Sequence, residues 1–136
     1  MSRLPYNAVP GQLPYPHVSL RIKDNYKDLI LGPFQCRVDS GSEATCVPAW
    51  IADNSGVHDY EEDVAYDFAG NPVDIWFVVV LDATVEVLDA QGAVAFQKSY
   101  IGMRFPILPD SEGLLGLDVL NDMVSTMDGP GLIFSI

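Results

Sequence analysis

The sequence contains an acidic residue placed directly after a predicted β-strand. Apolar and polar side chains alternate from Phe34 to Val38, and the strand that this pattern predicts leads into the turn Asp39-Ser40-Gly41. A turn of this kind can present a carboxylate for chemistry. The same residue types favour ordinary turns for local reasons, so the three-residue pattern alone is a weak signal. Its meaning depends on what the rest of the chain contains.

A second notable stretch lies far downstream. Leu114-Leu115-Gly116-Leu117 is an apolar run broken by one glycine, and Asp118 follows it. The two leucines before the glycine predict a short buried strand. Residues 118–123 are the strongest helix candidate in the chain, because Asp118 would lie near the N-terminus, where aspartate is favoured.

Most of the remaining sequence has the pattern of short β-strands joined by turns. Alternation of apolar and polar residues over 18–23 predicts a half-buried strand. Turn-forming residues at 69–72 and 89–92 separate β-branched segments and predict two hairpins, and residues 47–52 suggest a short strand or turn. We therefore expect an all-β, closed, barrel-like domain with one short C-terminal helix.

The length of 136 residues is close to the commonest size of a single domain. Four prolines within residues 1–16 prevent a regular helix there and predict an extended arm that runs over the surface. We expect the folded domain to cover residues 17–136. Within it, residues 59–63 contain four acidic side chains and are expected to form a solvated loop.

Charge and apolar run length argue against several classes of function. The formal net charge is −12 at pH 7, and such a surface repels nucleic acids and anionic membranes, so neither is expected as a partner. The longest apolar run, residues 75–81, is far shorter than the roughly 18 to 20 residues that cross a bilayer. Because the N-terminus also lacks the pattern of a signal peptide, the expected location is the cytoplasm.

Two cysteines flank the acidic turn. Cys36 and Cys46 do not form a Cys-x-x-Cys pair, and the histidines of the chain show no ligand spacing. We therefore expect no metal site and no cofactor. Both cysteines are predicted to be buried free thiols, with a disulfide between them as the alternative.

The order of these features resembles that of the retropepsin-like (retroviral-type, single-domain) aspartic proteases. That family has an apolar strand, Asp-Thr/Ser-Gly-Ala/Ser, a hydroxyl residue three positions further on, a flap hairpin, and later two apolar residues and a glycine before a helix. The matching residues here are Asp39-Ser40-Gly41-Ser42, Thr45, the hairpin around Gly70, and Leu114-Leu115-Gly116. The resemblance covers residues 17–136. One departure is Leu117, where the family often has a basic residue.

The resemblance implies an aspartic endopeptidase that hydrolyses peptide bonds in extended polypeptide segments. In such an enzyme two carboxylates share one proton and act as the base and the acid around an attacking water. This chain contains one such motif, so the implied unit is a homodimer in which the Asp39 residues of two subunits meet at a twofold axis. The implied partners are a second copy of the chain and a polypeptide substrate.

The resemblance also assigns roles to individual residues. The catalytic group comprises Asp39, Ser40 and Gly41, with the serine tying the two motif turns together and the glycine allowing close backbone approach. Substrate contacts are assigned to Ser42, Glu43, Tyr66, Ala69, Gly70 and Asn71, of which the last four belong to the flap hairpin. Structural support of the site is assigned to Thr45, Gly116 and Asp118.

Two other interpretations stay open at this point. The first is a non-catalytic peptide-binding or assembly module that retains the protease-like fold and holds a peptide by strand addition. The second is a monomeric β-domain in which Asp39-Ser40-Gly41 is an ordinary turn. The sequence does not separate them from a protease, because an intact Asp39 is required for catalysis but does not establish it.

Overall fold

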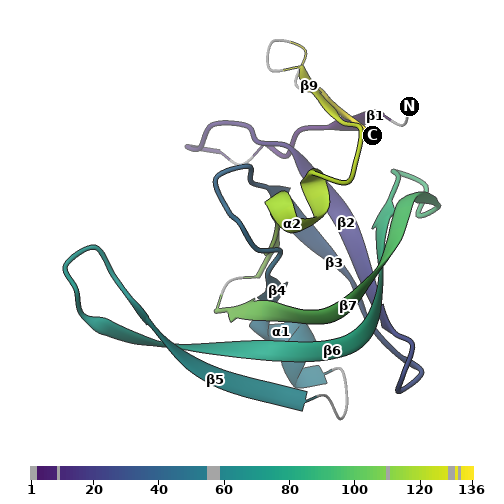
Figure 1. Cartoon of the computed structure of the whole chain (residues 1–136). Helices are drawn as coiled ribbons and strands as arrows, with labels where there is room; N and C mark the ends of the chain where they lie inside the picture. The colour runs from purple at the N-terminus through teal and green to yellow at the C-terminus, as the bar shows by residue number, and fades with distance from the viewer. Residues whose placement is uncertain (1–2, 9, 55–58, 110, 129–130, 132) are drawn as a thin grey trace.

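The computed structural model describes residues 3–8, 10–54, 59–109, 111–128, 131 and 133–136. Most of them form β-strands, which confirms the predicted, mainly β class. The strands are β1 (Arg3–Pro5), β2 (His17–Asp24), β3 (Leu29–Val38), β4 (Val47–Pro48), β5 (Asp59–Tyr66), β6 (Pro72–Leu88), β7 (Val94–Leu108), β8 (Gly113–Leu115), β9 (Thr126–Asp128) and β10 (Ile133–Ser135). The same residues include two short helices, α1 (Ala49–Asn54) and α2 (Leu117–Leu120) (Figure 1).

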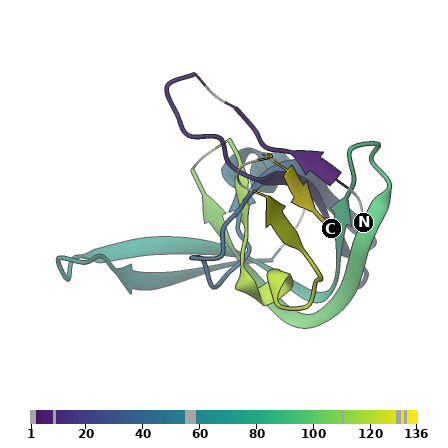
Figure 2. The ribbon, with the colours of Figure 1, turned by 90° about the horizontal axis from the view of Figure 1, so that it is seen from above.

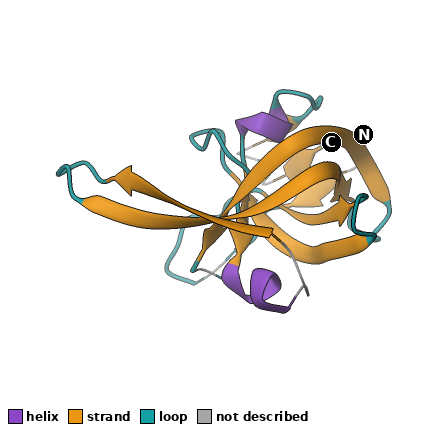
Figure 3. Cartoon of the chain, turned by 60° about the horizontal axis from the view of Figure 1, so that its bottom comes forward, coloured by secondary structure: helices purple, strands orange, loops and turns teal. Residues whose placement is uncertain are grey.

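The strands form a large curled sheet and a small one (Figure 3). The larger sheet has seven strands, in the order β4-β7-β6-β2-β3-β8 with β5 paired to β6, and the smaller sheet has the order β1-β10-β9. Within the described chain, the end strands β4 and β8 are joined only by one bridge between Cys46 and Leu114. These strands have two and three residues, and they pair with β7 and β3 rather than with each other. The expected closed barrel is therefore not found in the described residues.

One hydrophobic core connects the two sheets. Every second residue of β2 is buried, as the alternation over 18–23 predicts, because successive side chains of a strand point to opposite faces. Strands β6 and β7 wrap around this core as a long antiparallel pair. Phe105 on β7 and Phe134 on β10 are completely buried, so both sheets contribute large side chains to the same interior.

Strands β5 and β6 form a long hairpin that extends away from the body of the domain (Figures 1 and 2). The prediction of a loop at residues 59–63 is wrong, because these residues belong to β5 and pair with β6. Two of their acidic side chains lie beside Arg104 on β7. Its Nη2 atom lies 3.0 Å from Oε1 of Glu61 and 3.6 Å from Oδ2 of Asp63.

Helix α1 was not predicted, and the expectation of a single helix is wrong. Residues 47–52 were predicted as a strand or turn. In the structure β4 ends at Pro48 and α1 begins at Ala49. Proline is favoured at helix starts because its φ angle suits the helix and the first N–H groups have no intrahelical partner. Ile51 and Ala52 are buried, so α1 turns one side to the core.

Helix α2 is shorter than the helix predicted over residues 118–123. It covers Leu117–Leu120 and ends with Asn121 in right-handed helical geometry. In the part of the chain that the structure describes, no helix has the length and apolar character needed to cross a membrane.

The N-terminal residues take part in the fold. Strand β1 pairs antiparallel with β10, which places Leu4 beside Phe134, and both side chains are buried. The two chain ends consequently lie close together next to the small sheet (Figure 2). Segment 1–16, expected to run over the surface, thus contributes a strand and one core side chain, and the division of the chain after residue 16 stays a prediction.

Glu86 on β6 is a buried acid that is held by two basic residues. Its side chain accepts a hydrogen bond from Arg21 at 2.9 Å, and Lys23 Nζ lies 3.4 Å from the same oxygen. The hydrogen bond from Arg21 lowers the pKa of Glu86 from its ordinary value of 4.5, and the two positive charges act in the same direction.

We expect Glu86→Gln to lower the free energy of unfolding by about 1 to 3 kcal/mol at pH 7, because it removes a charged hydrogen-bond partner. A carboxyl whose pKa is depressed by folding stabilises the fold fully above its ordinary pKa and loses this effect as the pH falls through the folded-state pKa. Thermal unfolding measured from pH 7 downward should therefore show the two proteins converging in acid. Glu62→Gln, at an exposed position of β5, is the control, and a difference that stays constant into acid would contradict the assignment.

Candidate functional site

Strand β3 carries the chain to a point where two distant parts of the sequence meet. It pairs in parallel with β8, which places Val38 beside Leu115. The backbone N–H of Asp39 then donates to the carbonyl oxygen of Leu115 at 3.0 Å. The acidic turn therefore lies directly against the residues that lead into Gly116.

Asp39 is partly exposed, and its carboxylate is oriented by its own turn. The backbone N–H of Gly41 donates to Oδ1 of Asp39 at 2.9 Å, and the N–H of Ser42 donates to the Asp39 carbonyl oxygen at 3.2 Å. Oδ2 has no hydrogen-bond partner in the described residues. Ser40 and Gly41 are exposed beside it. One carboxylate oxygen is thus fixed in place while the other is free to contact another molecule.

A buried hydrogen-bond network holds the turn to the downstream stretch. The completely buried Thr45 donates to the carboxylate of Asp118 from its hydroxyl at 2.6 Å and from its backbone N–H at 2.9 and 3.0 Å to the two oxygens. The Thr45 hydroxyl in turn accepts a bond from the N–H of Gly116 at 3.1 Å. Asp118 therefore does not cap α2 with its side chain, as its position had suggested, but joins α2 to the turn.

Gly116 lies under the turn at very close range. A Cβ atom at this position would lie 2.5 Å from the carbonyl carbon and oxygen of Ala44 and 2.9 Å from the carbonyl oxygen of Ser42. The next two residues also bind the turn. The backbone N–H of Leu117 donates to the carbonyl oxygen of Ser42 at 2.9 Å, and that of Asp118 donates to the carbonyl oxygen of Glu43 at 3.1 Å. Only glycine permits this approach between the two backbones.

The two cysteines lie behind the turn as buried free thiols, as predicted. Burial raises the pKa of Cys36 well above its ordinary value. Burial, with a contribution from the nearby Asp118 carboxylate, raises the pKa of Cys46 to about 11. Both thiols are therefore protonated at neutral pH and behave as apolar core groups.

The tip of the β5–β6 hairpin carries the predicted flap residues Tyr66, Ala69, Gly70 and Asn71. Asp67 organises this tip, because its Oδ1 accepts bonds from the N–H groups of Ala69 at 2.9 Å and Asn71 at 2.8 Å. Gly70 has a φ of 82°, a left-handed conformation that favours glycine. All these bonds are local, and the tip projects away from the domain (Figure 1). The single chain brings Asp39, Thr45, Gly116 and Asp118 together but leaves the hairpin tip apart.

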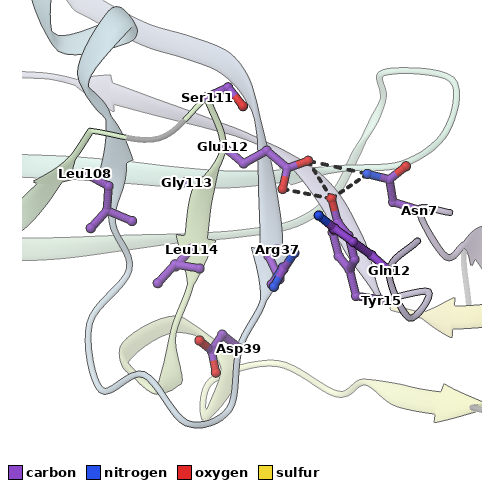
Figure 4. Close-up of a pocket in the computed structure, with 10 residues that line it drawn as sticks. All are labelled: Asn7, Gln12, Tyr15, Arg37, Asp39, Leu108, Ser111, Glu112, Gly113 and Leu114. Carbon is purple, nitrogen blue, oxygen red and sulfur yellow. Dashed lines mark hydrogen bonds between the residues drawn. The ribbon is translucent and has the colours of Figure 1, made fainter. Parts of the chain in front are cut away.

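A cavity of about 620 Å³ opens beside Asp39 (Figure 4). Its lining comes from three parts of the chain: the N-terminal segment, the end of β3, and the segment that enters β8. The lining residues are Asn7, Gln12, Tyr15, Arg37, Asp39, Leu108, Ser111, Glu112, Gly113 and Leu114. Most are polar or charged, so the cavity suits a hydrogen-bonding ligand.

The N-terminal segment is fastened to this cavity by Tyr15 and Asn7. The Tyr15 hydroxyl donates to Glu112, at 2.9 and 3.0 Å from its two oxygens, and Asn7 Nδ2 donates to the Tyr15 hydroxyl at 2.6 Å. Backbone bonds between Asn7 and Tyr15, at 2.8 and 3.1 Å, close the intervening loop. The guanidinium of Arg37 stacks on the Tyr15 ring, 3.9 Å from its centroid.

Sequence reasoning missed Arg37, Tyr15 and Glu112 as site residues. A signal for Arg37 existed, because a residue two positions before Asp39 on a strand shares its face. No local pattern could reveal Tyr15 and Glu112, which are 97 residues apart in the sequence. Among the described residues, no group of three or more histidine, cysteine or acidic side chains is arranged to hold a metal ion.

Comparisons with known proteins place the fold. No protein-family model and no curated protein matches this sequence. Among solved structures, the EIAV protease complexed with the inhibitor HBY-793 is similar, with a TM-score of 0.50, 14% sequence identity, and coverage of 85% of this chain and 93% of that chain. At this identity the likeness concerns the fold alone, and the chain has a retropepsin-like fold.

Thr45 provides a direct test of the network behind the turn. Thr45→Val keeps the shape of the side chain but removes the hydroxyl that donates to Asp118 and accepts from the Gly116 N–H, while the backbone N–H bonds of residue 45 to Asp118 remain. We expect it to lower the free energy of unfolding by about 2 to 3 kcal/mol. Thr45→Ser keeps the hydroxyl and removes one methyl group, so it should cost about 1 kcal/mol. Urea unfolding of both variants measures the difference, and equal losses would show that the hydroxyl is not what holds the turn.

Proposed function

We propose that this chain is an aspartic endopeptidase that acts as a homodimer. The observation that carries the proposal is the Asp39 carboxylate, partly exposed on a turn that is locked from behind by Gly116, Thr45 and Asp118. A reactive acid must be reachable by substrate and held in one orientation, and the two conditions are met here by different parts of the same network. The retropepsin-like fold supports the proposal without establishing it.

The chemistry explains why two chains are required. Activation of water for attack on a peptide carbonyl needs a base, and protonation of the leaving amine needs an acid. Two carboxylates a few ångströms apart supply both, because like charges at that distance cannot both ionise and therefore share one proton. A twofold axis beside the exposed turn would bring Asp39 of each subunit into such a pair.

The surrounding residues then have distinct tasks in the proposed dimer. The exposed Ser40 would hydrogen-bond across the axis, since its hydroxyl has no partner in the described part of a single chain. Gly41 fixes one Asp39 oxygen through its N–H. Ser42 is committed to its own turn, because its hydroxyl donates to the Ala44 carbonyl at 2.7 Å. Glu43 remains exposed and available to a bound peptide.

In the proposed dimer the projecting β5–β6 hairpin has the role of a flap. Its tip residues Tyr66, Ala69, Gly70 and Asn71 are exposed, and Tyr66 is 72% exposed. A hairpin that closes over a bound peptide excludes water from the reacting carboxylates and adds backbone hydrogen bonds to the substrate. The distance of the tip from the domain body in one chain fits a flap that works over the joint site of two chains.

Replacement of the acid tests the mechanism. We expect Asp39→Asn to abolish cleavage of an unfolded protein substrate or a peptide library between pH 4 and 7, because an amide can neither accept nor deliver the proton. The control is Asp53→Asn, an equal change of charge at an exposed position of α1, which should leave the rate within about twofold. Cleavage that survives Asp39→Asn would refute the mechanism. Peptide binding without any cleavage by the wild type would favour the non-catalytic module.

Mixing of subunits tests whether the site is shared. When wild type and Asp39→Asn are mixed in equal amounts and allowed to exchange, about a quarter of the dimers contain two wild-type chains. If both carboxylates are needed, activity should fall to about a quarter of that of the same total protein as wild type. Independent sites would leave about half. Sedimentation run in parallel measures how much dimer is present, and a fully active monomer would contradict the proposal.

A further inference from the structure

The cavity beside Asp39 contains an arginine, Arg37, that forms no ion pair with the described residues. The chain has 19 acidic and 7 basic residues, so partners for a positive charge are abundant. Ion pairs with carboxylates are formed by Arg21, Lys23, Lys98 and Arg104. Arg37 forms none with the described residues, and its contact there is the face of the Tyr15 ring. Arg3 forms none with these residues either, but it lies on β1 and does not line the cavity.

The arginine is also held in a geometry that suits a carboxylate. When a guanidinium lies flat on an aromatic ring, its N–H groups point away from its centre, parallel to the ring. Two of them can then donate parallel hydrogen bonds to one carboxylate. Tyr15 is itself fixed by its hydroxyl bond to Glu112 and by the backbone bonds to Asn7. The binding edge of Arg37 is therefore organised before any ligand arrives.

The position of Arg37 connects it to the reaction. Cys36 and Val38 point into the core, so Arg37 and Asp39 share the opposite face of the chain and line the same cavity (Figure 4). Two residues of extended chain span about 7 Å, which is the repeat of side chains on one face of a bound extended peptide. A side chain that reaches Arg37 therefore belongs to a residue within about two positions of the cleaved bond.

Asp39 and Glu112 are the acidic residues that line this cavity, and Glu112 is the one that anchors the N-terminal segment. Its two oxygens are both engaged by the Tyr15 hydroxyl, and Asn7 Nδ2 lies 3.5 Å from one of them. These neutral donors hold the carboxylate as an anchor for the N-terminal segment. Among the lining residues, Arg37 is the one with positively charged N–H donors, and it forms no ion pair with the described residues.

We propose that this cavity is a specificity subsite in which Arg37, supported by Tyr15, binds the carboxylate of an aspartate or glutamate side chain of the peptide. The inference rests on the proposed function, because it names the substrate class of that site. It makes Arg37 a specificity residue and assigns the N-terminal segment a part of the substrate-binding wall. Hydrolysis itself remains the task of Asp39.

The test measures peptide binding separately from cleavage. The full-length chain carrying Asp39→Asn is titrated with fluorescent peptide libraries in which one position is fixed as Glu or as Gln. At one position near the centre, we expect the Glu library to bind about tenfold more tightly, a difference typical of one charge-assisted pair. The preference should fall below about twofold when Arg37→Gln is added, and Arg37→Lys should retain part of it.

The matched control is Lys98→Gln, which removes one positive charge from an exposed position on β7 outside the cavity. It should leave the Glu preference unchanged. Equal binding of Glu and Gln libraries at every position, or a preference that survives Arg37→Gln, overturns the subsite. A loss that is equally large with Lys98→Gln also overturns it, because net charge would then explain the effect.

Cleavage of the same libraries by the wild type separates the two proposals. Asp39-dependent cleavage without a Glu preference overturns the subsite and leaves the protease. An Arg37-dependent Glu preference in a protein that never cleaves overturns the protease and leaves the subsite in a binding module. Thermal unfolding of each Arg37 variant confirms that the fold is intact, which is expected because the side chain lies on the exposed face of β3.

Discussion

The hydrogen bonds between Thr45 and Asp118 are the interaction on which the site depends. They join residues 73 apart in the sequence, and the Thr45 hydroxyl extends the connection to Gly116. All three groups are buried or partly buried, where an unsatisfied carboxylate or N–H would cost more than the bonds contribute. These buried bonds hold the turn that carries Asp39 in place. Among the described residues, the exposed side of the turn makes no contact on which the fold depends.

The parallel pairing of β3 with β8 makes this arrangement dependent on the whole domain. Parallel neighbours need a long connection, and here the connection runs through β4, α1 and the three long strands β5, β6 and β7. The position of β8 beside β3 therefore depends on the packing of those strands. The acidic turn and its support are close in space because the intervening chain has folded, so the site is a product of the complete core rather than of a local motif.

Sequence periodicity was sufficient for the elements that pack by alternation, and residue type predicted the Asp39 turn, whereas the position of Gly116 under that turn came from the resemblance to a family. Prediction from the sequence failed where contacts between residues far apart in the chain determine the structure. The acidic residues 59–63 form a strand because their backbone pairs with β6, and Arg104, some forty positions away, lies beside two of their side chains. The cavity wall was missed for the same reason, since the contact between Tyr15 and Glu112 leaves no trace in either local sequence.

The two faces of β3 show how stability and the proposed chemistry are divided. Phe34, Cys36 and Val38 are buried, whereas the alternate positions, including Arg37, face outward and lead to Asp39. A shift of one residue in the pairing of β3 would exchange these faces, placing an arginine in the core and a valine at the cavity. The apolar half of the strand thus fixes the position of the polar half, and the polar half contributes little to the core. Substitutions on the outward face can therefore change what the site binds while the fold that orients Asp39 is preserved.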